Sequence, residues 1–380
     1  MTTGEQGGSG YFLYHSIGQY ANKGVDLAAA MSRYAEIWGR PDDAQWPYLL
    51  GQQARFIDLW TNLIGAEPGT LTVAHNVTGA LYSLIGALPA NHLKGKKLLV
   101  AGDCFPSLHF LLNGLQARFG FDLITVPLRP GAYWVENEDV IAHWDDSVGL
   151  ALLTHASSTS SHLCDLETLV AHARAKGSLV GVDVTQSIGL VPYNVSTPLV
   201  DFTVSSTLKW LCGTSGAGVI QVARPLLETC TPELRGWFSQ ANPFSWDFNR
   251  FEYAGDIRRF DNGTPAAIAA LGSSPALEWH ARQDAKKLQA QNRAMTSLLV
   301  EAADEFRIPL ASPRNPEERG GSIMLTLPEE IDPPSLISAL RKKAVYADVR
   351  GRILRLSPGN ITTPDGVSRL ADQLKAVCKV

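Results

Sequence analysis

The central part of the chain alternates between short continuous hydrophobic runs and segments whose apolar residues recur at helical spacing. Runs of Val, Leu and Ile without alternating polar positions are typical of strands that are buried on both faces of a sheet. Strands interleaved with helices predict an α/β fold with a mainly parallel sheet covered on both sides. The predicted strands are 98–101, 121–126, 149–153, 179–182, 202–204 and 218–222, and the clearest helices between them are 110–119 and 166–176.

The N-terminal part has a different pattern of polar and apolar residues. Residues 1–10 are polar and glycine-rich, which predicts a disordered N-terminus. Residues 11–65 are predicted to form an N-terminal helical segment, because apolar positions recur at helical spacing over 27–39 and 52–64. A short strand at 70–73 and a helix over 80–88 then open a large domain, which is predicted to cover 66–285.

The C-terminal part predicts a second, smaller α/β domain over 286–380. One long helix, 275–306, is expected to connect the two domains, and a Pro/Arg/Gly-rich linker follows it. The predicted strands of the small domain are 323–327, 345–349 and 353–356, and its predicted helices are 335–343 and 363–377.

Composition narrows the class of protein. With 45% hydrophobic and 18% charged residues and a net charge of −4, the 380-residue chain is an ordinary globular sequence without a nucleic-acid-binding signature. Its five scattered cysteines form no CxxC pair, which argues against a disulfide framework or a structural metal site. The N-terminus does not resemble a secretory signal, and no apolar run reaches the ~18 residues needed to span a bilayer. We therefore expect a cytoplasmic protein with no membrane or nucleic-acid partner.

An acid and a lysine lie near the ends of two predicted strands. Asp183 follows the run 179–182, and Lys209 lies in an apolar turn just beyond 202–204 and Ser206. A lysine in apolar surroundings loses stabilisation of its charge, so its pKa falls and its amine becomes a usable nucleophile. An acid at the same sheet edge can keep a pyridinium nitrogen protonated, and this pair is what a pyridoxal 5'-phosphate (PLP) enzyme needs. The alternative is a surface lysine and a strand-end aspartate without chemistry.

A candidate phosphate site lies between the strand 70–73 and the helix 80–88. His75 and Asn76 occupy a polar turn there, and a strand–turn–helix junction offers free backbone N–H groups and a positive helix end. A plain helix N-cap explains Asn76 equally well. A long aromatic-rich segment, 231–264, is expected to belong to the core or an interface, or else to line a pocket.

These residues carry a resemblance to the fold type I PLP enzymes, in the branch that contains class V aminotransferases, cysteine desulfurases and kynureninase. It runs from about residue 12 to the end and is closest to kynureninase. Phe105 lies in a Phe-Pro-Ser turn like the one whose ring stacks on the cofactor, and Thr154 matches a strand end near the cofactor. Asp183 takes the place of the acid paired with the pyridine nitrogen, and Lys209 that of the Schiff-base lysine.

Further positions follow from the same resemblance. Gly236-Trp237-Phe238 is similar to a kynureninase motif, which places Trp237 among the expected cofactor contacts together with Gln186, Ser206, His75 and Asn76. The segment that ends at Arg355 is similar to the one whose arginine grips the substrate carboxylate, which suits a planar guanidinium. Thr264, in a Gly-Thr-Pro form typical of class V, is expected to reach the cofactor phosphate of a partner subunit. The resemblance thus implies a three-layer fold and a homodimer.

The resemblance implies an enzyme that acts on an α-amino acid through PLP. Our first expectation is a kynureninase-like lyase that cleaves a Cβ–Cγ or Cβ–heteroatom bond, with Lys209 removing the Cα proton. A class V aminotransferase is the alternative, supported by Gln186 and Thr264, and an amino-acid racemase or epimerase comes third, supported by the lysine turn. Leu208, Gln186 and Thr264 all depart from the kynureninase pattern, so kynurenine is not the expected substrate.

Overall fold

The computed structural model describes residues 9–378. The helices are α1 (Lys23–Trp38), α2 (Gln45–Ile64), α3 (Val77–Ile85), α4 (Pro106–Phe119), α5 (Asn137–Ala142), α6 (Leu166–Lys176), α7 (Arg224–Leu227), α8 (Ala267–Ala281), α9 (Ala285–Glu305), α10 (Pro333–Lys342) and α11 (Pro364–Cys378). The strands are β1 (Leu71–Ala74), β2 (Lys97–Ala101), β3 (Asp122–Val126), β4 (Val148–Thr154), β5 (Leu179–Asp183), β6 (Phe202–Ser206), β7 (Gly218–Val222), β8 (Ile323–Thr326), β9 (Asp348–Arg350) and β10 (Ile353–Leu356).

A seven-stranded sheet forms the centre of the large domain, in the order β1-β7-β6-β5-β4-β2-β3. All neighbouring pairs from β6 to β3 are parallel, whereas β7 runs antiparallel to both β1 and β6. The mainly parallel sheet predicted from the hydrophobic runs is therefore confirmed. Because β1 and β6 both run opposite to β7, the carboxyl ends of β1, β6, β5, β4 and β2 lie at one edge of the sheet.

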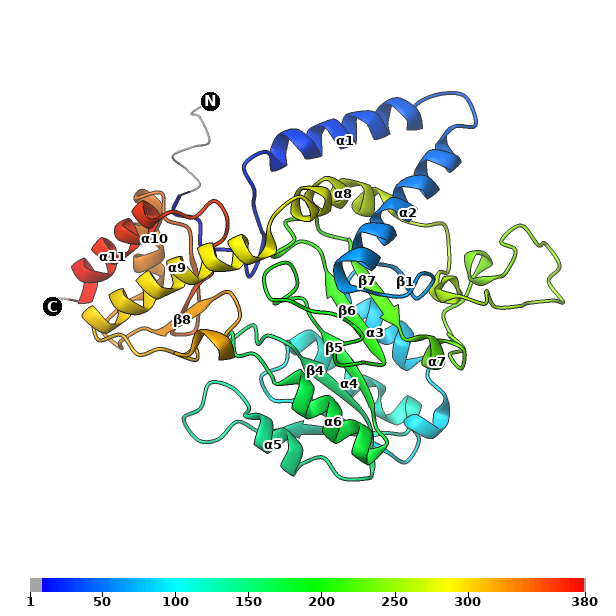
Figure 1. Cartoon of the computed structure of the whole chain (residues 1–380), viewed down its shortest axis with the longest axis horizontal. Coiled ribbons are helices and arrows are strands. Elements are labelled where there is room, and N and C mark those ends of the chain that lie inside the picture. The colour runs from blue at the N-terminus through cyan, green and yellow to red at the C-terminus, as the bar shows by residue number, and fades with distance from the viewer. Residues whose placement is uncertain (1–8, 379–380) are drawn as a thin grey trace.

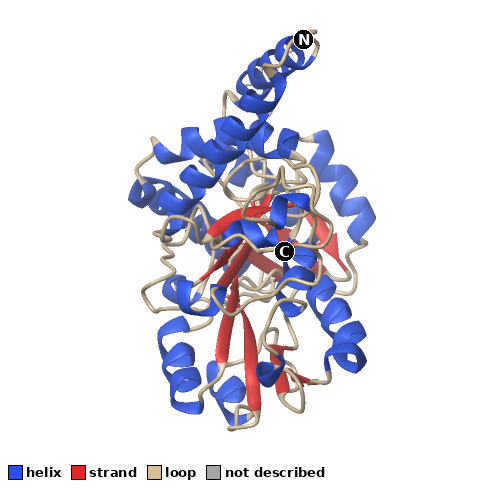
Figure 2. Ribbon diagram, turned by 90° about the vertical axis from the view of Figure 1, so that its right-hand side faces the viewer, coloured by secondary structure: helices blue, strands red, loops and turns tan. Residues whose placement is uncertain are grey.

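The sheet lies between two helical layers (Figure 2). Alternate residues of a strand face opposite layers. Leu98 and Val100 pack in the core cluster that contains α3 and α4, whereas Leu99 packs in the cluster that contains α2, α6 and α8. All three side chains are at most 1% exposed. Burying a leucine of this kind stabilises the fold by about 1.5–3 kcal/mol, which explains why the strands read as continuous apolar runs.

The small domain has its own sheet, in the order β8-β10-β9, and its own core against α9, α10 and α11 (Figure 1). Phe12, from the N-terminal segment, is fully buried in that core. Tyr11 forms a parallel bridge with Tyr346, and Leu13 does so with Ser357, so the chain touches the small domain before it enters α1. The packing of α8 on α2 and of α9 in the small core supports a boundary near 285/286, which we propose.

The N-terminus and the connection between the two domains differ from the sequence-based predictions. Residues 1–10 are predicted to be a disordered N-terminus, and 1–8 lie outside the described residues. Ser9 and Gly10 are buried, and the Gly10 carbonyl accepts a hydrogen bond from the Tyr346 amide at 2.8 Å. The single helix predicted over 275–306 is wrong, because α8 ends at Ala281 and α9 begins at Ala285. Asp284 causes the break, since its carboxylate accepts hydrogen bonds from the amides of the first turn of α9.

One predicted strand is shorter than expected. Residues 345–347 lie outside β9, which begins at Asp348; of these residues, Tyr346 forms an isolated bridge with Tyr11. Ala344 has a positive φ of 53°, and the Val345 amide hydrogen-bonds back to the Leu340 carbonyl at 3.0 Å. β9 therefore begins three residues later than predicted, beyond the turn that follows α10.

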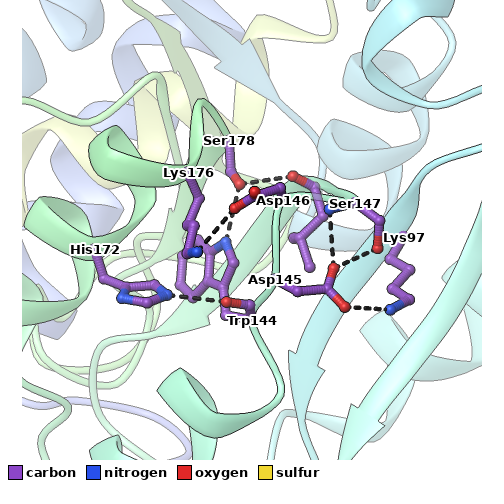
Figure 3. A network of polar contacts seen from close by, with 9 residues as sticks. Lys97, Trp144, Asp145, Asp146, Ser147, His172, Lys176 and Ser178 are labelled. Carbon is purple, nitrogen blue, oxygen red and sulfur yellow. Dashed lines mark hydrogen bonds and ion pairs between the residues drawn. The ribbon is translucent and has the colours of Figure 1, made fainter.

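A polar network closes the edge of the sheet at which the parallel strands begin (Figure 3). The Ser178 hydroxyl donates to the Val148 carbonyl at 2.6 Å and accepts from the Trp144 indole at 2.9 Å. Lys97, at the start of β2, forms an ion pair with Asp145 at 2.7 Å. These contacts fix the starts of β2, β4 and β5 and leave the opposite edge, where the strands end, open for ligands. Among residues 9–378, no helix is both long and apolar enough to cross a membrane.

Candidate active site

Several predicted site residues meet at the carboxyl edge of the large sheet. Thr154 ends β4 and lies beside Asp183 in the register, and Asp183 in turn lies beside Val204, two residues before Ser206. Across the antiparallel β7, Ser206 is aligned with Gly218, and Gly218 is aligned with Ala74 at the end of β1. The turn that follows Ala74 therefore starts at the same edge as these side chains.

Asp183 is an acid held in a polar niche within an apolar core. Its side chain is buried, and its Oδ1 accepts a hydrogen bond from the Thr185 amide at 2.9 Å. Burial raises the pKa of the carboxyl, while hydrogen bonds from Thr185 and the charge of Lys209 act in the opposite direction. A cationic ring nitrogen placed against this carboxylate would favour its ionised form further.

The pKa of the Lys209 amine is shifted towards neutral pH. Burial lowers its pKa from 10.5 to about 8; the negative charge of Asp183 opposes this shift, and the positive charges of Arg355 and Arg350 add to it. The Nζ atom lies 5.5 Å from the centre of the Phe105 ring, so an aromatic face borders the amine. Lys209, Asp183 and Phe105 therefore share one site, although they come from a turn, the end of β5 and the start of α4.

The turn that carries Lys209 is held by the N-terminal segment. The Gly18 amide donates to the Leu208 carbonyl at 2.9 Å, and the Cys212 amide donates to the Lys209 carbonyl at 2.9 Å. A Cβ atom at Gly18 would lie 1.8 Å from the Lys209 carbonyl oxygen, so only glycine permits this approach. Gly18 was not among the residues predicted for the site, because its role depends on contact between segments far apart in the sequence.

Buried hydroxyl groups around this site have no protein partner. The side-chain oxygens of Thr154, Ser206 and Thr207 make no hydrogen bond within the described part of the chain. An unsatisfied buried hydroxyl is costly, so such a group at a strand end calls for a ligand. The ring substituents and phosphate of PLP offer the acceptors and donors that these hydroxyls lack, and Asp183 and Lys209 supply the charge partners. The residues present therefore fit this cofactor.

His75, Asn76 and Thr264 line a neighbouring cleft of about 200 Å³. Asn76 caps α3, since its Oδ1 accepts a hydrogen bond from the Gly79 amide at 2.8 Å. Both interpretations of Asn76 therefore remain compatible, because a capped helix start still presents its other amides to an anion. The cleft also contains Asp261, whose pKa burial raises to about 6 and whose carboxylate accepts a hydrogen bond from Thr72 at 2.7 Å.

Arg355 reaches the site from the small domain and forms an ion pair there. It is 5% exposed, and its Nε donates to Asp348 Oδ1 at 2.8 Å while Nη2 contacts Oδ2. His15 Nε2 also lies 3.0 Å from Asp348 Oδ1. Gln186, from the large domain, donates to the His15 carbonyl at 3.2 Å. Sequence reasoning missed His15 and Asp348; the only signal was the polar end of an apolar run at 11–14.

Trp237 lies apart from this group of residues. It packs against Trp46, Phe238 and Phe244 and lines an apolar cavity of about 730 Å³ formed with α2. Within one chain, the structure therefore does not bring Trp237 to Lys209. The segment that follows it projects from the body of the large domain (Figure 1) and exposes Phe244 and Trp246 by 69% and 78%.

The cysteines close to the site are packing residues. Cys104 and Cys212 are buried, and burial raises the pKa of each thiol to about 12. Protonated thiols are poor nucleophiles, so neither side chain is poised for covalent catalysis.

Comparison of sequences identifies relatives over most of the chain. The profile of the family described as "Aminotransferase class-V" matches residues 58–352. The uncharacterized aminotransferase YcbU of Bacillus subtilis is 26% identical over 318 residues, which cover 83% of this chain and 81% of that protein. A kynureninase of Geobacillus thermodenitrificans is 26% identical, with 78% and 71% covered. Isopenicillin N epimerase of Streptomyces clavuligerus is also 26% identical, with 83% and 82% covered.

Solved structures resemble the fold closely despite low sequence identity. A cysteine desulfurase of Thermococcus onnurineus superposes with a TM-score of 0.85 at 18% identity, over 97% of this chain and 94% of that one. The cystine C–S lyase C-DES superposes with a TM-score of 0.86 at 19% identity, over 96% of this chain and 97% of that one. At this identity the similarity establishes the three-layer fold type I architecture and nothing about the reaction.

Proposed function

We propose that this chain, which belongs to the class-V aminotransferase family, is a kynureninase-like lyase acting on an α-amino acid. As a member of this family the chain is an enzyme, and its cofactor is PLP. The reaction in the proposal is cleavage of a Cβ–Cγ or Cβ–heteroatom bond. The observation that carries it is a single tuned base, Lys209, whose amine borders the apolar ring of Phe105.

Asp183 and Lys209 are assigned the central roles. When bound, PLP acts as an electron sink for the bonds at the amino-acid Cα. Asp183 would hold a proton on the ring nitrogen through its buried carboxylate. With a pKa of about 8, Lys209 is suited to take a proton from Cα and to return one to a neighbouring atom near neutral pH.

Phe105, Arg355 and the unpartnered hydroxyls are assigned binding roles. The Phe105 ring would cover one face of the cofactor and exclude water from it. Arg355 would bind the carboxylate of the amino acid with its planar guanidinium. Thr154 and Ser206, together with the amides behind His75 and Asn76, would hydrogen-bond the cofactor, and Gln186 would contact its ring.

Two other reactions start from the same residues. Transamination is the alternative, supported by Gln186 and Thr264, which follow the aminotransferase form, and by the similarity to YcbU. Racemisation or epimerisation comes third, supported by the lysine turn and the similarity to isopenicillin N epimerase. A phenylalanine ring can neither donate nor accept a proton, so the side that Phe105 covers offers no second base for a two-base racemase.

A panel of amino acids separates the three reactions. PLP-loaded protein is incubated with each L-amino acid, including L-kynurenine and L-cysteine, in deuterated buffer, and the products are identified by mass spectrometry. The proposal expects alanine or pyruvate together with a released side-chain fragment. Pyridoxamine phosphate with a keto acid would contradict the lyase proposal and indicate transamination. Deuterium at Cα without a net product would contradict it and indicate racemisation.

We also propose a cytoplasmic homodimer. Phe248 is 96% exposed beside the exposed Phe244 and Trp246, and such aromatic surface is normally covered by a partner. In a dimer, Thr264 and Trp237 would be able to serve the partner subunit's cofactor, although neither lies next to Lys209 of its own chain. Light scattering of the purified protein tests this proposal, and a monomer at micromolar concentration would contradict it.

A further inference from the structure

The guanidinium of Arg355 is held along one edge and left open along another. Its Nε and Nη2 atoms contact the two carboxylate oxygens of Asp348. No hydrogen bond joins Nη1 to any other residue in the range 9–378. A guanidinium has five N–H donors in a fixed plane, so one carboxylate on the Nε edge leaves room for a second carboxylate on the Nη edge.

The pair faces the active site because of strand register. Asp348 in β9 lies directly opposite Arg355 in β10, and Arg355 lies opposite Met324 in β8. Neighbouring positions such as Val349, Leu354 and Leu325 alternate to the other face and pack in the small-domain core. Asp348 and Arg355 therefore share the face that is turned away from that core, and the charge of Arg355 lowers the pKa of Lys209.

His15 contacts Asp348 and is itself held by a chain of hydrogen bonds that crosses both domains. Its Nδ1 lies 2.6 Å from the Ser357 hydroxyl, and the Ser357 and Ser322 hydroxyls lie 2.6 Å apart. The Ser322 amide donates to the Ser161 hydroxyl, in the loop after β4, at 3.1 Å. With Ser357 donating to Nδ1, the His15 proton lies on Nε2, which is 3.0 Å from Asp348 Oδ1 in an oblique approach.

The charges are consistent with this assignment. Burial lowers the pKa of His15, so its ring is neutral near pH 7 and can accept a hydrogen bond from Ser357. Burial raises the pKa of Asp348, but contacts with His15 and Arg355 outweigh this effect and leave it well below its usual range. Removing Asp348 would leave Arg355 as a buried guanidinium without a counter-charge, and nothing else in the described residues would fix its plane.

We propose that Asp348 and His15 are positioning residues for substrate binding: they hold Arg355 by its Nε edge and present its Nη edge to the carboxylate of the amino acid. The inference rests on the proposed function, since it assigns the substrate carboxylate to Arg355. It adds that recognition needs the N-terminal segment, through His15, and the small domain, through Asp348. Neither residue touches the substrate.

The test compares Asp348→Asn with a matched variant in a second Asp–Arg pair. Asp304 forms a similar two-point contact with Arg314 on the exposed surface of the small domain, so Asp304→Asn removes the same charge away from the site. Each PLP-loaded variant is assayed with the amino acid that wild-type protein turns over best in the panel, and with the amine that lacks only its carboxylate. Visible absorbance and the melting temperature report whether the cofactor site and the fold are intact.

We expect Asp348→Asn to raise KM for the amino acid by about tenfold or more, because hydrogen bonds between charged groups are lost. The kcat should change by less than about twofold, and the spectral dissociation constant of the amine should stay the same. Asp304→Asn should change neither constant. His15→Ala should raise KM in the same carboxylate-dependent way, and His15→Gln, which retains an N–H donor, should restore part of the loss.

Three results would overturn the inference. A fall in KM for Asp348→Asn would mean that Asp348 competes with the substrate for Arg355. Equal changes for the amino acid and the amine would mean that Asp348 acts on the fold alone. If Asp348→Asn fails to fold, an unchanged KM in His15→Ala would also overturn the inference. Absence of any amino-acid turnover or binding by wild-type protein would instead refute the proposed function.

Discussion

The titration of Lys209 provides a quantitative test of the site that does not depend on the substrate. In PLP-free protein, burial lowers the pKa of this amine from 10.5 to about 8. Two neighbouring charges change the pKa of Lys209 in opposite directions. The Asp183 carboxylate raises the pKa, so Asp183→Asn should lower it further, whereas Arg355 lowers it, so Arg355→Met should raise it.

The size of the effect follows from the fraction of neutral amine. At pH 7, an amine with a pKa of about 8 is neutral in about one molecule in ten, against about one in three thousand for a pKa of 10.5. Because only the neutral amine reacts with an acylating reagent, Lys209 should react up to about 300-fold faster than an unshifted lysine of equal accessibility. The reaction rate should rise with pH and level off above the folded-state pKa.

Competitive labelling with acetic anhydride measures this rate. PLP-free protein is labelled in trace amounts between pH 6 and pH 11, and the Lys209 peptide is quantified by mass spectrometry, with the same peptide in urea-unfolded protein as the control. We expect a midpoint near pH 8 in the folded protein and near the ordinary lysine value in urea. A folded-state midpoint at the ordinary value, or shifts of the wrong sign in the Asp183→Asn and Arg355→Met variants, would refute the electrostatic reasoning.

Two further substitutions test the local geometry, each with a matched control. Gly18→Ala should weaken PLP retention, measured by dialysis and visible absorbance, because the added Cβ collides with the Lys209 carbonyl; Gly24→Ala, in α1 with open space around it, should retain PLP as wild type does. Asn76→Ala should destabilise the fold by about 1 kcal/mol in urea through loss of the α3 cap and should also weaken PLP binding. Asp165→Ala removes the equivalent cap of α6 and should cost similar stability without changing PLP affinity; equal effects on PLP in the two variants would remove Asn76 from the phosphate site.

The sheet could be predicted from the sequence because strands that are buried on both faces consist of continuous apolar runs. Every run from 98–101 to 218–222 except 202–204 contains residues of both core clusters, so the apolar positions are continuous and the strands are recognisable; in 202–204 the buried Thr203 takes the middle position. Asp183 and Lys209 were found for the same reason, since parallel strands bring the residues after them to one edge. Helix boundaries were less predictable, because a single capping side chain such as Asp284 decides them.

The contacts between domains could not be predicted from the sequence. His15, Asp348 and Gly18 acquire their roles only where the N-terminal segment lies between the lysine turn and the small sheet. No local periodicity encodes a contact between residues 15 and 348. Trp237 shows the converse: its motif resembles a cofactor contact, but its ring packs with Trp46 and Phe238.

We propose that Lys209 is the residue that holds PLP covalently. The most direct measurement is reduction of the PLP-loaded protein with borohydride, followed by digestion and mass spectrometry of every lysine peptide. We expect one pyridoxyl-phosphate adduct per chain, located on Lys209, and no adduct in a Lys209→Ala variant. An adduct on another lysine, or none on a wild-type protein that has been saturated with PLP, would contradict it.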